Sequence, residues 1–227
     1  NEDSPYNFIG GGRGNIICDL LYNVIGGGFN NKTCAGFTSE GTFIGGGENN
    51  TVSGYVSAVA GGTTNTACNS SFIGGGASNL AMGCVSGILA GEFNHVCGCH
   101  SAIVSGRSNR ICNTGLRSFI GSGCTNTIST NFGFVGSGCS NTVCTSDFGA
   151  VVDGACNRAT GCFAFIGNGG NFTAAGYILN NQASGDCSFI GNGYVNCGFG
   201  GYSFIGNGRG NTIDPPASVC YSFIGNG

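Results

Sequence analysis

One pattern of nine residues returns throughout the chain and limits what it can fold into more than any other feature. Ser-Phe-Ile-Gly-Gly-Gly-Ala-Ser-Asn occupies residues 71–79, and close copies occupy residues 118–126 and 203–211. Weaker copies fill the intervals between them. A short repeat of this kind predicts stacked, similar units in which each unit contacts its neighbours.

We align the repeats on the second apolar residue of the pattern and call it the anchor. The usual spacing of the anchors is 14 or 15 residues, longer steps occur from Ile25 to Ile44 and from Ile205 to Ile224, and Ile178 lies 12 residues from each neighbour. The residue three after the anchor is Gly in every repeat but one, where it is Asn181. The anchors are Ile9, Ile25, Ile44, Val59, Ile73, Ile88, Ile103, Ile120, Val135, Val151, Ile166, Ile178, Ile190, Ile205 and Ile224.

Each repeat contains two short apolar segments, one at the anchor and one about eight residues later. Short β-branched segments bounded by Gly and Asn are typical of strands, and Gly at this frequency (47 of 227 residues) opposes helices. Two strands and two turns in about 15 residues form one turn of a parallel β-solenoid. We therefore predict an all-β fold, with one repetitive domain over residues 1–227 that is a segment of a longer fibre chain.

Asn recurs six residues after the anchor. Its side-chain amide can hydrogen-bond to the equivalent Asn of neighbouring turns, and Asn tolerates the left-handed backbone conformation that turns often need. Gly three after the anchor would supply a positive φ or room for the next turn. The predicted structural ladder comprises Asn15, Asn31, Asn50, Asn65, Asn79, Asn94, Asn109, Asn126, Asn141, Asn157, Asn196 and Asn211.

Phe recurs immediately before the anchor. Adjacent residues of a strand face opposite sides, so an inward anchor predicts an outward Phe. A row of exposed Phe is a large apolar patch, which favours oligomerisation through this face. The alternative is a locally bent strand that places both residues in one core. The interface candidates are Phe8, Phe43, Phe72, Phe119, Phe134, Phe165, Phe189, Phe204 and Phe223.

Charge and the length of the apolar runs argue against two classes of partner, nucleic acid and membrane. Charged residues make up 7% of the chain and the net charge is −3, so there is no basic surface for nucleic acid. No apolar run approaches the ~18 residues of a membrane span, so we expect no membrane insertion. A surface of Gly, Asn, Ser and Thr suits a fibre better than an electrostatic binder.

Ten of the 15 cysteines recur at two positions of the repeat, nine after and four before the anchor. Ser, Thr and Ala occupy the same positions elsewhere, which favours small, buried, reduced cysteines. Disulfides between neighbouring turns remain possible, because turns about 4.8 Å apart suit the Cα separation of a disulfide.

Catalysis and metal binding have little support in the sequence. The segment Cys97-Gly98-Cys99-His100 resembles a set of metal ligands, but both cysteines fall in the repeat's cysteine positions and a zinc site needs four ligands. The carboxylates fall at different repeat positions, and the Gly-rich turns do not open a helix as a phosphate loop does. We therefore expect no enzyme activity, no cofactor and no catalytic or metal site.

The repeat Ser-Phe-Ile-Gly-Gly-Gly-x-x-Asn resembles the head repeats of YadA-type trimeric autotransporter adhesins. It is still more similar to the Ile-Gly-Gly-Gly-x-x-Asn arrays of phage and large-virus fibre proteins. This resemblance implies a left-handed parallel β-roll assembled as a homotrimer. The Phe column, the Asn column and the cysteines depart from the adhesin head, and the sequence contains no heptad stalk or membrane anchor.

The expected function is that of a tail or capsid fibre on the virion surface, a rigid trimeric rod for host attachment. Its partners would be itself, other virion proteins and a host-surface glycan or protein, contacted by loops at residues 29–40, 170–185 and 214–219. The alternative is a bacterial surface adhesin head. An ice-binding solenoid is a third hypothesis, because Thr51, Thr66, Thr127, Thr142 and Thr212 share one repeat position.

Overall fold

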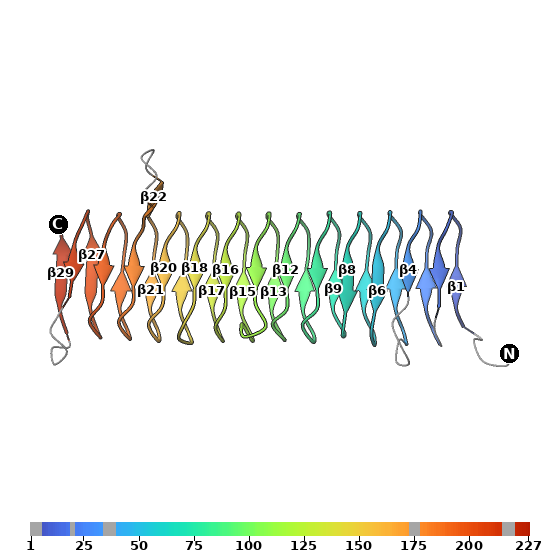
Figure 1. Cartoon of the computed structure of the whole chain (residues 1–227), viewed down its shortest axis with the longest axis horizontal. Coiled ribbons are helices and arrows are strands. Elements are labelled where there is room, and N and C mark those ends of the chain that lie inside the picture. Colours follow the sequence, from blue (N-terminus) through green and yellow to red (C-terminus); the bar gives the residue numbers. More distant parts are fainter. Residues whose placement is uncertain (1–5, 19–20, 34–39, 173–177, 215–220) are drawn as a thin grey trace. The chain divides into compact units, whose positions relative to one another are not determined.

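The computed structural model describes residues 6–18, 21–33, 40–172, 178–214 and 221–227. It divides into two compact units, residues 1–108 and 109–227, which we describe separately. Each unit is an all-β parallel β-solenoid with two parallel sheets and about 15 residues per turn (Figure 1). The predicted fold class is therefore confirmed. No helix in the described part of the chain is suited to crossing a membrane.

In the first unit, the anchors lie in one sheet, which we call the anchor sheet, and the second apolar segments lie in the opposite sheet. The anchor sheet contains β1 (Phe8–Ile9), β3 (Val24–Ile25), β5 (Phe43–Ile44), β7 (Ala58–Val59), β9 (Phe72–Ile73), β11 (Gly87–Ile88) and β13 (Ala102–Ile103). The opposite sheet contains β2 (Ile16–Ile17), β4 (Lys32–Thr33), β6 (Thr51–Ser53), β8 (Thr66–Cys68), β10 (Leu80–Ala81) and β12 (His95–Val96).

The second unit repeats this arrangement. Its anchor sheet contains β15 (Phe119–Ile120), β17 (Phe134–Val135), β19 (Ala150–Val151), β21 (Phe165–Ile166), β25 (Phe189–Ile190), β27 (Phe204–Asn207) and β29 (Phe223–Asn226). Its opposite sheet contains β14 (Arg110–Ile111), β16 (Thr127–Ile128), β18 (Thr142–Val143), β20 (Arg158–Ala159), β24 (Gln182–Ala183), β26 (Cys197–Gly198) and β28 (Thr212–Ile213).

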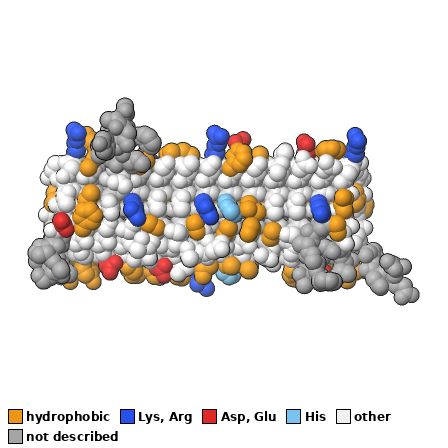
Figure 2. Space-filling view, in the orientation of Figure 1, with side chains coloured by type: hydrophobic (Ala, Val, Ile, Leu, Met, Phe, Trp, Pro, Cys, Tyr) orange, Lys and Arg blue, Asp and Glu red, His pale blue; other side chains and the backbone are white. Residues whose placement is uncertain are grey.

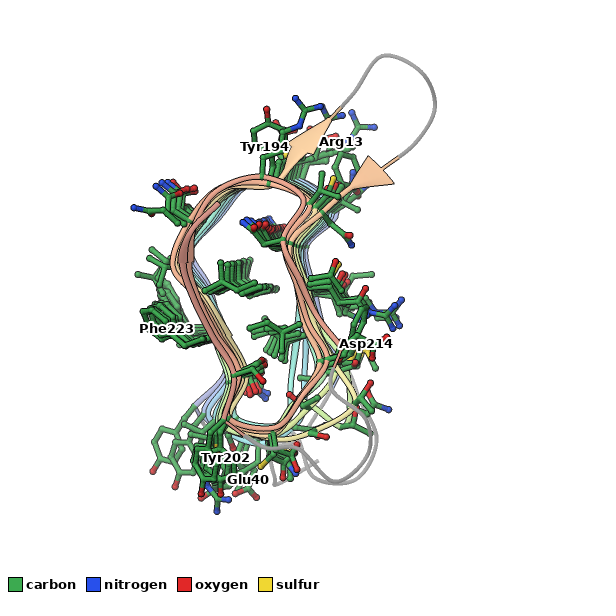
Figure 3. The ribbon with its side chains drawn as sticks, turned by 90° about the vertical axis from the view of Figure 1, so that its left-hand side faces the viewer. Arg13, Glu40, Tyr194, Tyr202, Asp214 and Phe223 are labelled. Carbon is green, nitrogen blue, oxygen red and sulfur yellow. The ribbon has the colours of Figure 1, made fainter. Side chains whose placement is uncertain are left out.

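The core is the thin space between the two sheets. Anchors such as Ile73 and Ile88 are fully buried, and so are residues of the facing wall such as Val96 and Ile128. Figure 3 is viewed along the direction in which the turns stack. It shows apolar side chains between the two walls, with Phe223 on the outside. The strands alternate as predicted, because in pairs such as Phe43–Ile44 the first residue is exposed and the second buried. The alternative of a locally bent strand, with both residues in one core, is therefore wrong.

Gly three after the anchor is required for both reasons that the sequence suggests. Gly76 has a φ of +90°, in the left-handed region, and a Cβ built on it would clash with the backbone of Gly91 in the next turn. Gly75, one residue earlier, has no neighbouring heavy atom within 4 Å of such a Cβ. The structure therefore has room for a side chain at Gly75 but not at Gly76.

We expect Gly76→Ala to lower the free energy of unfolding by about 3 kcal/mol, since it adds backbone strain to a clash with a fixed backbone. Gly75→Ala is the matched control and should change it by less than about 0.5 kcal/mol. Urea denaturation followed by circular dichroism measures both. Equal effects of the two substitutions would contradict this account of the turn.

A second left-handed position of this turn differs from the prediction. It falls on the residue before each ladder Asn, for example Ser78 (φ 54°) and Thr125 (φ 53°), and no ladder Asn has a positive φ. The ladder Asn residues are instead selected for hydrogen bonding inside the turn. The interpretation that Asn recurs because it tolerates the left-handed region is therefore wrong.

The region around Ile178 also differs from the prediction. Ile178 does not lie in the anchor sheet, because β23 (Ile178–Leu179) pairs antiparallel with β22 (Asn171–Phe172) in a separate hairpin. The anchor of this turn is Ile166, which pairs directly with Ile190. Asn181 and Ala183 then supply the ladder position and the opposite-sheet position of the same turn. The hairpin is thus an insertion into a single long turn.

Candidate functional site

The outer surface of the anchor sheet is the candidate site. It is formed by the residue before each anchor and the residue after it, and we call it the Phe face. Phe8, Phe43, Phe72, Phe119, Phe134 and Phe223 are exposed there. Phe165, Phe189 and Phe204 are half-buried. All nine candidate Phe residues thus lie on one kind of surface, and their role in assembly remains a prediction.

Phe rings of this face lie beside the Gly that follows their anchor. A Cβ built on Gly45 would lie 3.4 Å from Cε1 of Phe43, and one built on Gly206 would lie 3.4 Å from Cε1 of Phe204. The two positions are on the same side of the strand, since they are two residues apart. The recurring Phe-Ile-Gly therefore packs a large ring against a bare backbone.

Large and small residues exchange places on the Phe face. Where the residue before the anchor is small, the residue after it is often large, as in Gly87 with Leu89 and Ala150 with Val152. Leu89 and Val152 are exposed, and Gly87 and Ala150 pair in register with neighbouring Phe residues. The apolar surface therefore continues across turns that lack a Phe.

Aromatic stacking lines up the rings of the second unit. The ring centroids of Phe165 and Phe189 are 5.1 Å apart, those of Phe189 and Phe204 are 4.8 Å apart, and those of Phe204 and Phe223 are 5.0 Å apart. The rings are close to parallel, so each covers its neighbours' faces and presents its edge outward. Such a surface offers shape and apolar area to a partner, with little for hydrogen bonding.

The opposite sheet has a different outer surface. Lys32, His95, Arg110 and Arg158 project from its strands, in register with Thr residues such as Thr127 and Thr142. Figure 2 shows one face of the molecule, on which Lys, Arg and His side chains stand among hydrophobic ones. Among the described residues, no charged side chain occupies the positions on either side of the anchors. The two sheets thus differ in charge.

The Asn ladder supports the turn beside the anchor sheet. All its members but Asn15 and Asn211 are buried, and hydrogen bonds join neighbouring members, such as Asn79 to Asn65 and Asn141 to Asn126. Asn79 Nδ2 donates to the carbonyl oxygens of Gly75 in its own turn (3.1 Å) and of Gly91 in the next (2.7 Å). Asn79 Oδ1 accepts the backbone N–H of Asn94 at 3.0 Å. Each Asn therefore satisfies backbone groups of two turns.

The inserted hairpin interrupts this ladder. Asn157 donates to Asp153 and Gly169 in the usual way, but its buried Oδ1 has no hydrogen-bond partner within the described residues. The ladder resumes at Asn181, whose Oδ1 accepts the backbone N–H of Asn196 at 3.1 Å. Asn181 was missed as a ladder residue because the hairpin changes its distance from the anchor.

A second row of aromatic residues was also missed by sequence reasoning. It lies three residues before the anchor, on the turn at the other end of the anchor strand, and its backbone is left-handed, as at Phe148 (φ 62°) and Tyr202 (φ 55°). Ring centroids of Phe132 and Phe148 are 4.6 Å apart, and those of Phe148 and Phe163 are 4.7 Å apart. The residue type varies at this position, so no recurring residue type marks this row in the sequence.

Most of the described cysteines are reduced, as the sequence favoured, but only Cys156 among these thiols is buried, so the expected burial is wrong. Cys18 is disulfide-bonded, and twelve other described cysteines are thiols. Two cysteines, Cys124 and Cys139, occupy a position four after the anchor that the sequence reasoning did not single out. Their sulfur atoms lie 2.6 Å apart on neighbouring turns.

The possible metal ligands do not converge. Cys97 Sγ contacts His95 Nε2 at 3.0 Å, across the opposite sheet's outer surface. In the part of the chain that the structure describes, no group of three His, Cys, Asp or Glu side chains could hold a metal ion. No pocket is found there either.

The Thr column is interrupted. Thr51 pairs with Thr66, and Thr127 with Thr142, but Leu80 and Arg158 follow these pairs. Each run of Thr therefore extends over two neighbouring turns. Parts of the three candidate recognition loops, residues 34–39, 173–177 and 215–219, lie outside the described residues.

No protein-family model matches this chain, and a search of the curated proteins finds no match. The Phe face and the fold that presents it are therefore the basis of the functional proposal.

Proposed function

We propose that this chain is a structural segment of a virion fibre, on a tail or capsid, which assembles as a homotrimer through the Phe face. Its role is mechanical: a stiff, non-catalytic support that holds host-binding loops away from the particle. The resemblance of the Ser-Phe-Ile-Gly-Gly-Gly-x-x-Asn repeat to virus fibre arrays supports this assignment, and with it the proposal of a location on the virion surface.

The observation that carries the proposal is the difference between the two outer surfaces. One sheet carries Lys32, Arg110 and Arg158 and suits contact with water. The other carries Phe residues, with Leu89 and Val152 continuing the surface where Phe is missing. Contiguous apolar surface of this kind is rare on soluble monomers and marks an interaction site.

A closed trimer accounts for this surface better than an open assembly. Three copies that turn their Phe faces toward a common axis cover them completely and leave no free apolar patch for further growth. Burying one Phe side chain contributes about 1.5–3 kcal/mol, so a row of them supplies a large driving force. The charged sheets then face outward, where they keep the assembly in solution.

Recognition of a host glycan or protein falls to the loops at residues 29–40, 170–185 and 214–219. Loops that lengthen a turn disturb the stacked strands little, so they can vary while the solenoid is maintained. The hairpin of β22 and β23 is one such extension. Other virion proteins would contact the ends of the trimer.

Sedimentation equilibrium of the purified chain tests the proposal. We expect a single species of three times the 22.6 kDa chain mass that persists on dilution. A stable monomer or dimer would contradict the trimer, and the fibre assignment would then lose its physical support.

A further inference from the structure

Two thiols of the second unit meet on neighbouring turns. Cys124 and Cys139 follow the anchors Ile120 and Val135 by four residues, and they pair as a parallel bridge. Cys124 Sγ donates to Cys139 Sγ at a separation of 2.6 Å, which is closer than two unbonded sulfur atoms normally approach. Both side chains are half-buried, so a small reagent can reach them.

We propose that Cys124 and Cys139 form a thiol–disulfide site that a small-molecule disulfide, such as oxidised glutathione, converts into a cross-link between the two turns. An S–S bond of about 2.05 Å requires the sulfurs to approach by only a fraction of an ångström. The stacked strands already hold the two residues in register, so the backbone needs little change.

The surroundings favour Cys139 as the attacking thiol. The hydrogen bond donated by Cys124 lowers the pKa of Cys139, and contacts with Ser140 and Thr125 act in the same direction. The Thr125 hydroxyl lies 3.8 Å from Cys139 Sγ and 2.8 Å from Ser140 Oγ. A lower pKa raises the fraction of thiolate, which is the reactive form.

The reaction is a two-step exchange. The Cys139 thiolate attacks one sulfur of oxidised glutathione, which forms a mixed disulfide and releases one glutathione thiolate. Cys124 then loses its proton to solvent, attacks Cys139 Sγ and displaces the second glutathione. Two protein thiols are oxidised to one disulfide, and one oxidised glutathione is reduced to two glutathione molecules.

Neighbouring cysteines are less suited to this reaction. Cys156 is also close to Cys139, but it is buried, and burial raises the pKa of its thiol. Cys84 and Cys99 lie on neighbouring turns of the first unit, where the Cys84 N–H donates to Cys99 Sγ at 3.2 Å. The hydrogen bond with Cys99 raises the pKa of Cys84, which is unfavourable for attack by that thiol.

The test is oxidation of the folded, reduced chain with glutathione disulfide, followed by denaturation, alkylation and peptide mapping. Residues 118–157 contain no Lys or Arg, so trypsin cannot separate the two cysteines, whereas chymotrypsin can cut after Phe132 and Phe134. We expect a loss of two thiols per chain and a cross-linked peptide pair whose fragmentation places the bond at Cys124 and Cys139. Cys144→Ser should leave this product unchanged.

Single substitutions test the assigned order of attack. Cys124→Ser should accumulate the glutathione adduct on Cys139, because no second thiol resolves it. Cys139→Ser should form an adduct on Cys124 more slowly. The proposal is overturned if the wild type gives adducts on exposed Cys84 and Cys187 without the cross-link, or if Cys139 bonds to Cys156 instead. Faster modification of Cys124 than of Cys139 overturns the assigned roles.

Discussion

Replacing Asn196 by Ala is expected to lower the free energy of unfolding by about 3–5 kcal/mol, because several buried backbone groups lose their hydrogen-bond partner at once. Asn196 Nδ2 donates to Gly208 O at 2.9 Å and to Asn192 O at 3.2 Å. Its Oδ1 accepts the backbone N–H of Asn211 at 3.1 Å. Ala can replace none of these bonds, and the neighbouring turn leaves little room for water.

Asn192→Ala is the matched control, since it removes the same side chain from an exposed position of the same turn. Asn192 Oδ1 accepts only a local bond from Gly193 N–H, at 2.6 Å, so the expected loss is below about 1 kcal/mol. Urea denaturation of the two variants and the wild type gives the comparison. Similar stabilities for Asn196→Ala and the wild type would show that the ladder contributes little.

The sequence predicted the solenoid well because one residue type suits one position of every turn. Stacked turns place equivalent residues in the same surroundings, so Gly76 and its equivalents meet the same backbone clash and Asn79 and its equivalents the same carbonyl groups. The outward Phe and inward Ile followed from the alternation of a strand. A residue type that recurs in the sequence therefore marks a position whose local geometry is repeated from turn to turn.

Sequence reasoning missed the features that do not recur as one residue type at a constant distance from the anchor. The inserted hairpin shifts Asn181 away from its expected distance, and Ile178 fits the apolar pattern although it pairs with Phe172. The left-handed residue before each ladder Asn varies among Gly, Asn, Ser, Thr, Phe, Cys and Val, so no single residue type marks this position in the sequence. The Cys124–Cys139 contact depends on two neighbouring turns alone.

Phe119→Ser with Phe134→Ser is expected to convert the trimer into monomers while the fold of each chain is retained. Loss of two Phe side chains from each of three subunits removes about 9–18 kcal/mol of burial from the assembly. The anchors Ile120 and Val135 remain buried beneath these positions, so the core loses nothing. Sedimentation velocity measures the assembly, and far-ultraviolet circular dichroism measures the fold.

Phe132→Ser with Phe148→Ser separates a specific interface from general loss of aromatic surface. Phe132 and Phe148 are 40% and 42% exposed, against 38% and 39% for Phe119 and Phe134, and both pairs are stacked. The control pair lies on the turn outside the Phe face, so its loss should leave the trimer intact. Dissociation by both double variants would point to a partner surface on the turn as well, and dissociation by the control alone would move the interface off the Phe face.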